Sequence, residues 1–188
     1  FGHDARLATA LPDQAVGRSA REEMRRHGIS TDAVVAAPGR MGLYYLESGS
    51  NVRSAQVIYD REGSSFAMTP AAAYDWDAIL APADWFHVTG ISAALGEAPA
   101  ATMAEAMAAA AARGIPVSLD VNYRASLWER AGRDAAAVMT PLLDHVSVLF
   151  AGADDSAACL GVTAPDEGTA LDRFCATAAQ LMARHSGL

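Results

Sequence analysis

Residues 84–121 contain two strand-like segments joined by one long helical segment, and this order restricts the fold more than any other feature of the chain. The first segment, DWFHVTG, spans 84–90, and the second, IPVSLDV, spans 115–121. The Ala-rich stretch between them (97–114) predicts a helix. A strand, a helix and a strand in this order form a parallel pair with a right-handed crossover. The sequence therefore predicts an α/β protein with a mostly parallel sheet.

Polar side chains gather where the second of these strands ends. The segment reads IPVSLDVNYR, so an apolar strand runs into Asp120, Asn122 and Arg124. A strand covered by helices on both faces is expected to be apolar on both faces. Ligands of open α/β sheets bind outside the carboxyl ends of the strands. We therefore expect a site here, whereas His87 in the preceding strand is expected to be a core histidine with its hydrogen bonds satisfied.

A different pattern occupies residues 42–62. GLYYLES (42–48) and VRSAQVIYDRE (52–62) are rich in aromatic and β-branched residues, and GSN between them is a turn signal. These residues predict a β-hairpin with no helix between its strands. Further strands are expected at 5–11, 33–37 and 146–150, and further helices at 14–28, 131–143, 154–160 and 168–185.

Composition excludes several classes of protein. The 188 residues are 52% hydrophobic and 19% charged, which is typical of a globular domain. The net charge is −8 and every basic residue is Arg, so neither nucleic acid nor an anionic membrane is an expected partner. A P-loop needs a Lys that this stretch lacks, and no G-x-G-x-x-G follows a strand. No apolar run is long enough to cross a membrane, so a cytoplasmic location is expected.

Several quoted stretches together resemble one family. The segment 2–34 resembles the early βα unit of the ribokinase-like (PfkB) sugar kinases, and VSLDVNYRASLW (117–128) resembles their D-x-N-x-R segment. GLYYLE, VIYDREGSS and FHVTGIS, in that order and spacing, are similar to 2-keto-3-deoxygluconate kinases within this family. The resemblance implies a ribokinase-like α/β fold, with a mostly parallel central sheet flanked by helices. It also implies a core of residues 1–40 and 64–188, with a small β-sheet lid at 41–63.

The resemblance implies roles for residues that contact the sugar. Tyr44 occupies the position that touches the keto acid, and Tyr59 and Arg61 match a Tyr-x-Arg pair that reaches the substrate carboxylate and hydroxyls. Ile91 matches a backbone contact to the substrate. Arg124 matches a catalytic arginine at the rim between the sugar and the nucleotide phosphates.

The same resemblance implies a site for ATP and Mg²⁺. Asp120 and Asn122 match the polar strand end near the phosphates and the metal. Relatives often carry Asn-x-x-Glu where this chain has Gly152 and Asp155, so the acid is kept in shortened form and the amide is lost. Asp155 and Asp120 are the candidate metal ligands, although Asp155 also fits an ordinary helix N-terminus.

Several of the other roles have a structural alternative that the sequence leaves open. Arg61 on a hairpin can be a solvated charge, and Tyr44 and Tyr59 can be sheet packing. Asp120 can cap the loop after its strand, and Arg124 can pair with Asp120 as a structural ion pair.

Two further motifs of the family are expected outside the sequence, so we expect residues to be missing at both ends. A Gly-Asn motif should precede Phe1, and a G-A-G-D motif with the catalytic base Asp should follow Leu188. The resemblance implies ATP-dependent phosphorylation of the terminal hydroxyl of 2-keto-3-deoxygluconate, and a homodimer or higher oligomer formed through the lid. The alternatives are another PfkB kinase of the fructokinase or ribokinase type, or a non-catalytic sugar-binding or dimerisation module if the chain is complete.

Overall fold

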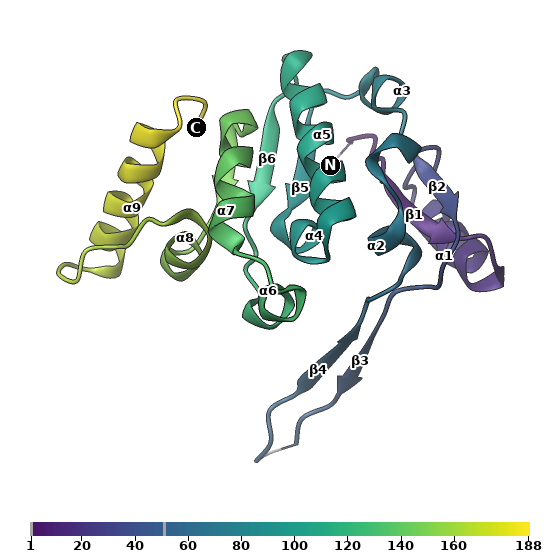
Figure 1. Cartoon of the computed structure of the whole chain (residues 1–188), viewed down its shortest axis with the longest axis horizontal. Helices are drawn as coiled ribbons and strands as arrows, with labels where there is room; N and C mark the ends of the chain where they lie inside the picture. Colours follow the sequence, from purple (N-terminus) through teal and green to yellow (C-terminus); the bar gives the residue numbers. More distant parts are fainter. Residues whose placement is uncertain (1, 51) are drawn as a thin grey trace. The chain divides into compact units, whose positions relative to one another are not determined.

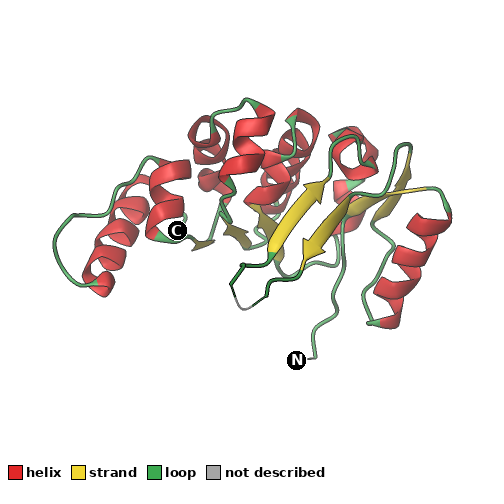
Figure 2. Cartoon of the chain, turned by 90° about the horizontal axis from the view of Figure 1, so that it is seen from below, coloured by secondary structure: helices red, strands yellow, loops and turns green. Residues whose placement is uncertain are grey.

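The computed structural model describes residues 2–50 and 52–188. The chain divides into two compact units, Phe1–Tyr74 and Asp75–Leu188. Figures 1 and 2 show the strands and helices of each unit in sequence order and by type. Within the described residues, no helix combines the length and apolar character needed to cross a bilayer.

The first unit begins with a parallel strand–helix–strand element. β1 (Thr9–Pro12) pairs with β2 (Val34–Ala37), and α1 (Ala15–Arg26) connects them. Arg21 donates to the Val34 carbonyl (3.0 Å) and Arg25 to the Thr31 hydroxyl (2.8 Å), so these two arginines fasten α1 beside β2. The helix ends as expected before Gly28, whose φ of 76° suits glycine.

The hairpin is the second element of this unit. β3 (Leu43–Glu47) and β4 (Gln56–Asp60) pair antiparallel, and Figure 1 shows them as a long ribbon that leads away from the β1–β2 pair. The predicted hairpin is therefore present, but its predicted turn residue Asn51 lies outside the described residues. The unit closes with two short elements, α2 (Ser65–Met68) and the 3-10 helix η1 (Ala71–Ala73).

The second unit is built on a three-stranded parallel sheet. β5 (Phe86–Thr89), β6 (Val117–Asp120) and β7 (Val148–Phe150) lie in the order β5-β6-β7. This arrangement confirms the predicted α/β class with parallel strands. The helices around the sheet are α3 (Trp76–Leu80), α4 (Gly90–Ala94), α5 (Glu97–Ala112), α6 (Ala125–Ala131), α7 (Ala135–Met139), η2 (Thr140–His145), α8 (Ala153–Leu160) and α9 (Ala170–Arg184).

The two faces of this sheet differ. Val117 and Leu119 are fully buried on one face, where α5 supplies Met107 to the same core. The opposite face carries His87 and Phe150, both exposed. The prediction that His87 is a core histidine is therefore wrong, although its ring does have a partner. Its Nδ1 lies 2.8 Å from the Ser118 hydroxyl, on the open face of β5 and β6.

Candidate functional site

The first group of predicted site residues lies on one face of the hairpin. Tyr44 lies directly opposite Tyr59 in the antiparallel ladder, so their side chains point to the same side of the ribbon. Arg61 follows the end of β4, and its guanidinium carbon lies 4.5 Å from the centre of the Tyr59 ring. The structure therefore brings two aromatic rings and one cation together within a few residues of the hairpin base.

The surroundings of this group leave it accessible to a ligand. Tyr44 is 63% exposed, and Tyr59 and Arg61 are half-buried. Among the described residues, Arg61 has no carboxylate partner. A cation that lies over a ring and is not neutralised by an acid can bind an anion, because N–H groups that do not point at the ring remain available.

A second group lies where the strands of the second unit end. Asp120 is the last residue of β6 and is half-buried. It lies between Thr89 of β5 and Phe150 of β7 in the register of the sheet. Asn122 follows in the left-handed region, with φ of 44°, and its amide nitrogen lies 3.4 Å from the Thr89 hydroxyl. An asparagine tolerates this conformation better than most residues, and such positions cluster at functional sites.

Helix α4 begins at the end of β5 without a loop. Its first residue, Gly90, lies so close to the Val121 carbonyl oxygen that a side chain would collide with it. Ile91 follows in the first turn and is half-buried. The close approach shows why a glycine is required where β5 passes into α4.

Arg124 lies at the start of α6 and is exposed. Its guanidinium donates to the carbonyl of the neighbouring Tyr123 (2.8 Å). Within the described part of the chain no ion pair joins Arg124 to Asp120, so the structural alternative of such a pair is not found. The guanidinium is free to meet a ligand from solvent.

The segment after β7 leads into α8. Gly152 precedes the helix, and Asp155 lies half-buried in its first turn. Burial, together with the negative charge of Asp155, raises the pKa of the Cys159 thiol to about 11. A carboxylate in a first helical turn is favourable on its own account, so a purely structural role for Asp155 stays open.

The donor set allows a magnesium site that includes phosphate ligands. No group of three or more His, Cys, Asp or Glu side chains in the described residues is arranged to hold a metal by itself. Mg²⁺ commonly takes only one or two carboxylates, with phosphate oxygens and waters completing the shell. Asp120 and Asp155 fit this pattern, because both are half-buried and neither has an ion-pair partner among the described residues.

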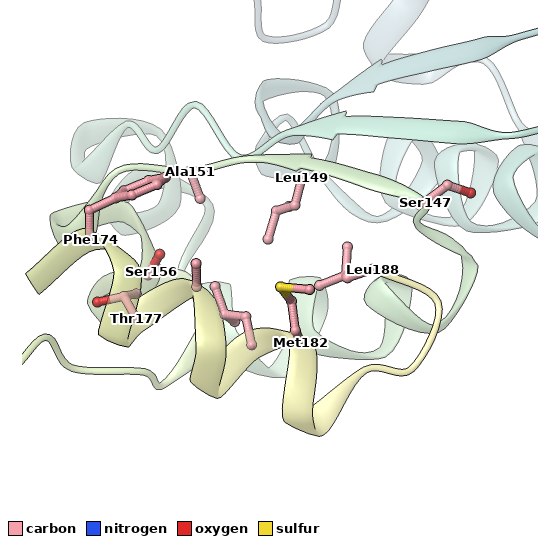
Figure 3. Close-up of a pocket in the computed structure, with 10 residues that line it drawn as sticks. Ser147, Leu149, Ala151, Ser156, Phe174, Thr177, Met182 and Leu188 are labelled. Atoms are coloured by element: carbon pink, nitrogen blue, oxygen red, sulfur yellow. The ribbon is translucent and has the colours of Figure 1, made fainter. Parts of the chain in front are cut away.

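A separate apolar groove of about 180 Å³ lies between β7, α8 and α9 (Figure 3). Leu149, Met182 and Leu188 project into it, as the close-up shows. It contains none of the predicted site residues and no acid, base or cation, so it offers no catalytic chemistry. Its lining residues are Ser147, Leu149, Ala151, Ser156, Phe174, Thr177, Ala178, Leu181, Met182 and Leu188.

Two contacts near the predicted site residues were not predicted from the sequence. Thr89 is the partner of Asn122, and Arg40 binds the carboxylate of Asp60 beside Arg61. The only sequence signal for the second contact is the opposite charge of two residues flanking the hairpin.

The parallel sheet, with polar residues following its strands, defines the class: an α/β protein whose ligand site is expected at the carboxyl edge of the sheet. Residues 1–182 match the family described as pfkB family carbohydrate kinase. Since this match covers nearly the whole chain, the chain belongs to the pfkB family of carbohydrate kinases.

The chain is also similar to individual proteins whose names state an activity. The chain is 33% identical, over 161 residues, to a 2-dehydro-3-deoxygalactonokinase of Haloferax volcanii, covering 85% of this chain and 49% of that protein. It is 29% identical, over 163 residues, to a 2-dehydro-3-deoxygluconokinase of Thermoproteus tenax, covering 86% of this chain and 49% of that protein. The crystal structure of a 2-dehydro-3-deoxygluconokinase of Thermotoga maritima matches with a TM-score of 0.88 at 33% identity, covering 98% of this chain and 56% of that one. The 188 residues thus span about half the length of these relatives.

Proposed function

We propose that the protein containing these residues transfers the γ-phosphate of ATP to the terminal hydroxyl of 2-keto-3-deoxygluconate. The observation that carries this proposal is the accessible Arg61 guanidinium stacked on Tyr59, with Tyr44 beside it. A planar guanidinium binds a carboxylate through two parallel hydrogen bonds. Such a contact contributes roughly 1.5–3 kcal/mol, which favours an acid over a neutral sugar by about one to two orders of magnitude.

In this proposal residues 41–63 form a lid over the sugar, and residues 1–40 and 64–188 belong to the core. The lid also joins two copies of the protein into a homodimer or a higher oligomer. Exposed apolar side chains on both faces of the ribbon support this second role. Leu46 shares a face with Tyr44, whereas Tyr45 and Ile58 occupy the opposite face, and all four are exposed.

The strand-end residues face the nucleotide in this proposal. Asp120, Asn122 and the backbone at Gly152 lie near the phosphates, and Ile91 contributes a backbone contact to the sugar. Arg124 steadies the charge that grows on the phosphoryl group during transfer. Asp155 and Asp120 would hold Mg²⁺, which would supply positive charge to offset that of the phosphates.

The general base of this mechanism is an Asp in the half of the family fold that these 188 residues do not span. Its task is to accept the proton of the attacking hydroxyl. The residues present here supply binding and orientation, and phosphoryl transfer depends mainly on positioning and charge neutralisation. The cytoplasmic location expected from the sequence stays a prediction.

The test is ADP release by the whole protein with ATP and Mg²⁺, using 2-keto-3-deoxygluconate, fructose and ribose in parallel, with a sugar-free control. Turnover with the keto acid alone supports the proposal. Turnover with a neutral sugar alone replaces it with a fructokinase- or ribokinase-type activity. Absence of turnover with every sugar favours a non-catalytic sugar-binding or dimerisation module.

A further inference from the structure

The hairpin that carries Tyr44 and Tyr59 has little packing of its own. Every residue of β3 is exposed, and three of the five residues of β4 are exposed as well. An isolated two-stranded ribbon is at best marginally stable in water. Contacts at its base must therefore fix the direction in which its substrate-facing side chains point.

The Arg40 side chain makes several of the contacts at this base. The Arg40 guanidinium binds both carboxylate oxygens of Asp60, one of them at 3.0 Å. It also donates to the Asp60 carbonyl (3.4 Å) and to the Glu62 carbonyl (2.6 Å). These two carbonyl groups flank Arg61 in the chain, so a single guanidinium holds the backbone on both sides of the residue proposed to bind the substrate.

The backbone of Arg40 is itself held on one side, because the Ser65 N–H donates to the Arg40 carbonyl (2.9 Å). Gly39 has φ of 111° and Gly63 has φ of 63°, so glycines lie on both chains that enter the hairpin. Gly42 also lacks a side chain where one would approach Ser64. Glycines free the backbone next to this anchored segment, and the several hydrogen bonds of the Arg40 side chain restrain the end of β4 beside it.

The Arg40–Asp60 ion pair also keeps the charge of Asp60 from neutralising that of Arg61. Side chains alternate along a strand, so Asp60 faces away from Tyr59, whereas Arg61 turns back to the Tyr59 side. Arg40 forms an ion pair with the Asp60 carboxylate. Without Arg40, this carboxylate would be an unpaired acid on the residue next to Arg61 in the chain. Arg61 is left without a carboxylate partner among the described residues and keeps its charge available for an anion.

We infer that Arg40 is a positioning residue for substrate binding: by clamping Asp60 and the Glu62 carbonyl, it fixes the orientation of Arg61 and Tyr59. This inference rests on the proposed function for the identity of the substrate. It does not depend on that function for the existence of the clamp. Arg40 itself does not touch the substrate.

The experiment measures the whole protein and its variants Arg40→Ala, Arg40→Lys and Asp60→Ala, together with the double variant. The expected result for Arg40→Ala is an increase of about tenfold in the KM for the sugar, with the KM for ATP unchanged and kcat reduced less. Arg40→Lys restores only part of the loss, because an ammonium cannot form the bidentate contact. The double variant is no worse than Arg40→Ala alone, since both residues act through one contact.

Hydrogen exchange gives a readout that does not require activity. Amides of residues 43–47 and 56–60 are expected to exchange faster in Arg40→Ala, while those of α5 keep their wild-type rates. Arg26→Ala is the matched control, because Arg26 is an exposed arginine of the same unit whose side chain pairs, within the described residues, with Glu23 alone, one turn away. It should change neither the KM for the sugar nor hairpin exchange.

Two results would overturn the inference: an unchanged KM for the sugar in Arg40→Ala, or an equal rise in the KM for ATP with faster exchange throughout the protein. If the wild-type protein phosphorylates only a neutral sugar, the proposed function is wrong. The KM of each variant for that neutral sugar then tests the role of Arg40 in place of the KM for the keto acid. If it phosphorylates none, hairpin exchange alone decides: faster exchange confined to the hairpin supports the clamp, and unchanged exchange overturns it.

Discussion

The guanidinium of Arg61 lies over the ring of Tyr59, with 4.5 Å between its carbon and the ring centre. The ring supports the cation from one side, so N–H groups that do not point at the ring can form hydrogen bonds to a ligand. Tyr44, directly across the ladder from Tyr59, extends the aromatic surface next to this cation. The three side chains thus form a small surface on which a carboxylate and a short carbon chain can both be held.

The ring under Arg61 provides the first prediction. In the whole protein, Tyr59→Leu should raise the KM for the keto acid about two- to fivefold, because a partly exposed cation–π contact contributes about 0.5–1 kcal/mol. Tyr59→Phe keeps the ring and should raise the KM less. Steady-state kinetics of both variants check this. Equal effects of the two substitutions would mean that the hydroxyl, and not the ring, supports Arg61.

Replacing Gly90 or Gly152, which both follow strands, with alanine should have different effects on the free energy of unfolding. At Gly90 an added Cβ collides with the Val121 carbonyl and lies 2.9 Å from a methyl carbon of Met139. Gly90→Ala should lower the free energy of unfolding by about 1–3 kcal/mol, measured by urea denaturation. At Gly152 the nearest atom is 3.9 Å away and φ is −78°, so Gly152→Ala should leave stability nearly unchanged.

This pair of variants also bears on the phosphate site. If Gly152→Ala is stable but binds ATP more weakly than the wild type, the effect belongs to the nucleotide and not to the fold. A large loss of stability in Gly152→Ala, or none in Gly90→Ala, would contradict the packing described for these strand ends.

Asn122 provides a third prediction, because it combines a left-handed backbone with a side-chain hydrogen bond. Asn122→Ala should be less stable than Asn122→Gly by about 1 kcal/mol, since alanine pays the steric cost of φ near 44° and glycine does not. Both variants lose the contact to Thr89. Urea denaturation of the two proteins side by side makes the comparison, and equal stability would show that this backbone conformation is not held in the folded protein.

The two cysteines should differ in reactivity. Burial and the charge of Asp155 raise the pKa of Cys159 to about 11, so at pH 8 nearly all of it is the unreactive thiol. Cys175 is exposed on α9. Brief treatment of the native protein with iodoacetamide, followed by peptide mass mapping, should label Cys175 and spare Cys159, whereas both should react in urea. Labelling of Cys159 at the rate of Cys175 would contradict its burial.

Strong local patterns predicted the main elements, and tertiary packing decided the rest. The Ala-rich helix and the alternating strands were visible because their periodicity is long and regular, and α5 begins at the predicted residue, 97. The short helices α4 and α6 were missed, since neither is long enough to show a period. Asp13 is of a residue type that often caps helices, but Gln14 occupies the N-cap of α1 and Asp13 pairs with Arg18.

The types of residue in the candidate site could be predicted from the sequence, but their geometry could be predicted only in part. The hairpin itself was predicted from its residue types and turn signal, whereas the register that places Tyr44 opposite Tyr59 was not. The apolar pattern also did not predict that β6 ends at Asp120 and that Asn122 adopts a left-handed backbone conformation. The contacts of Arg40 with Asp60 and Glu62 depend on how the two chain segments at the hairpin base lie beside each other. No local sequence pattern determines that arrangement.

The most direct test of the account is the change in specificity caused by Arg61→Ala. The quantity to measure is kcat/KM of the whole protein for 2-keto-3-deoxygluconate and for a neutral sugar, with Arg26→Ala as control. The account predicts a fall of about one to two orders of magnitude for the keto acid and a much smaller change for the neutral sugar. Keto-acid turnover that stays within about twofold of the wild type would contradict the claim that Arg61 recognises the substrate carboxylate.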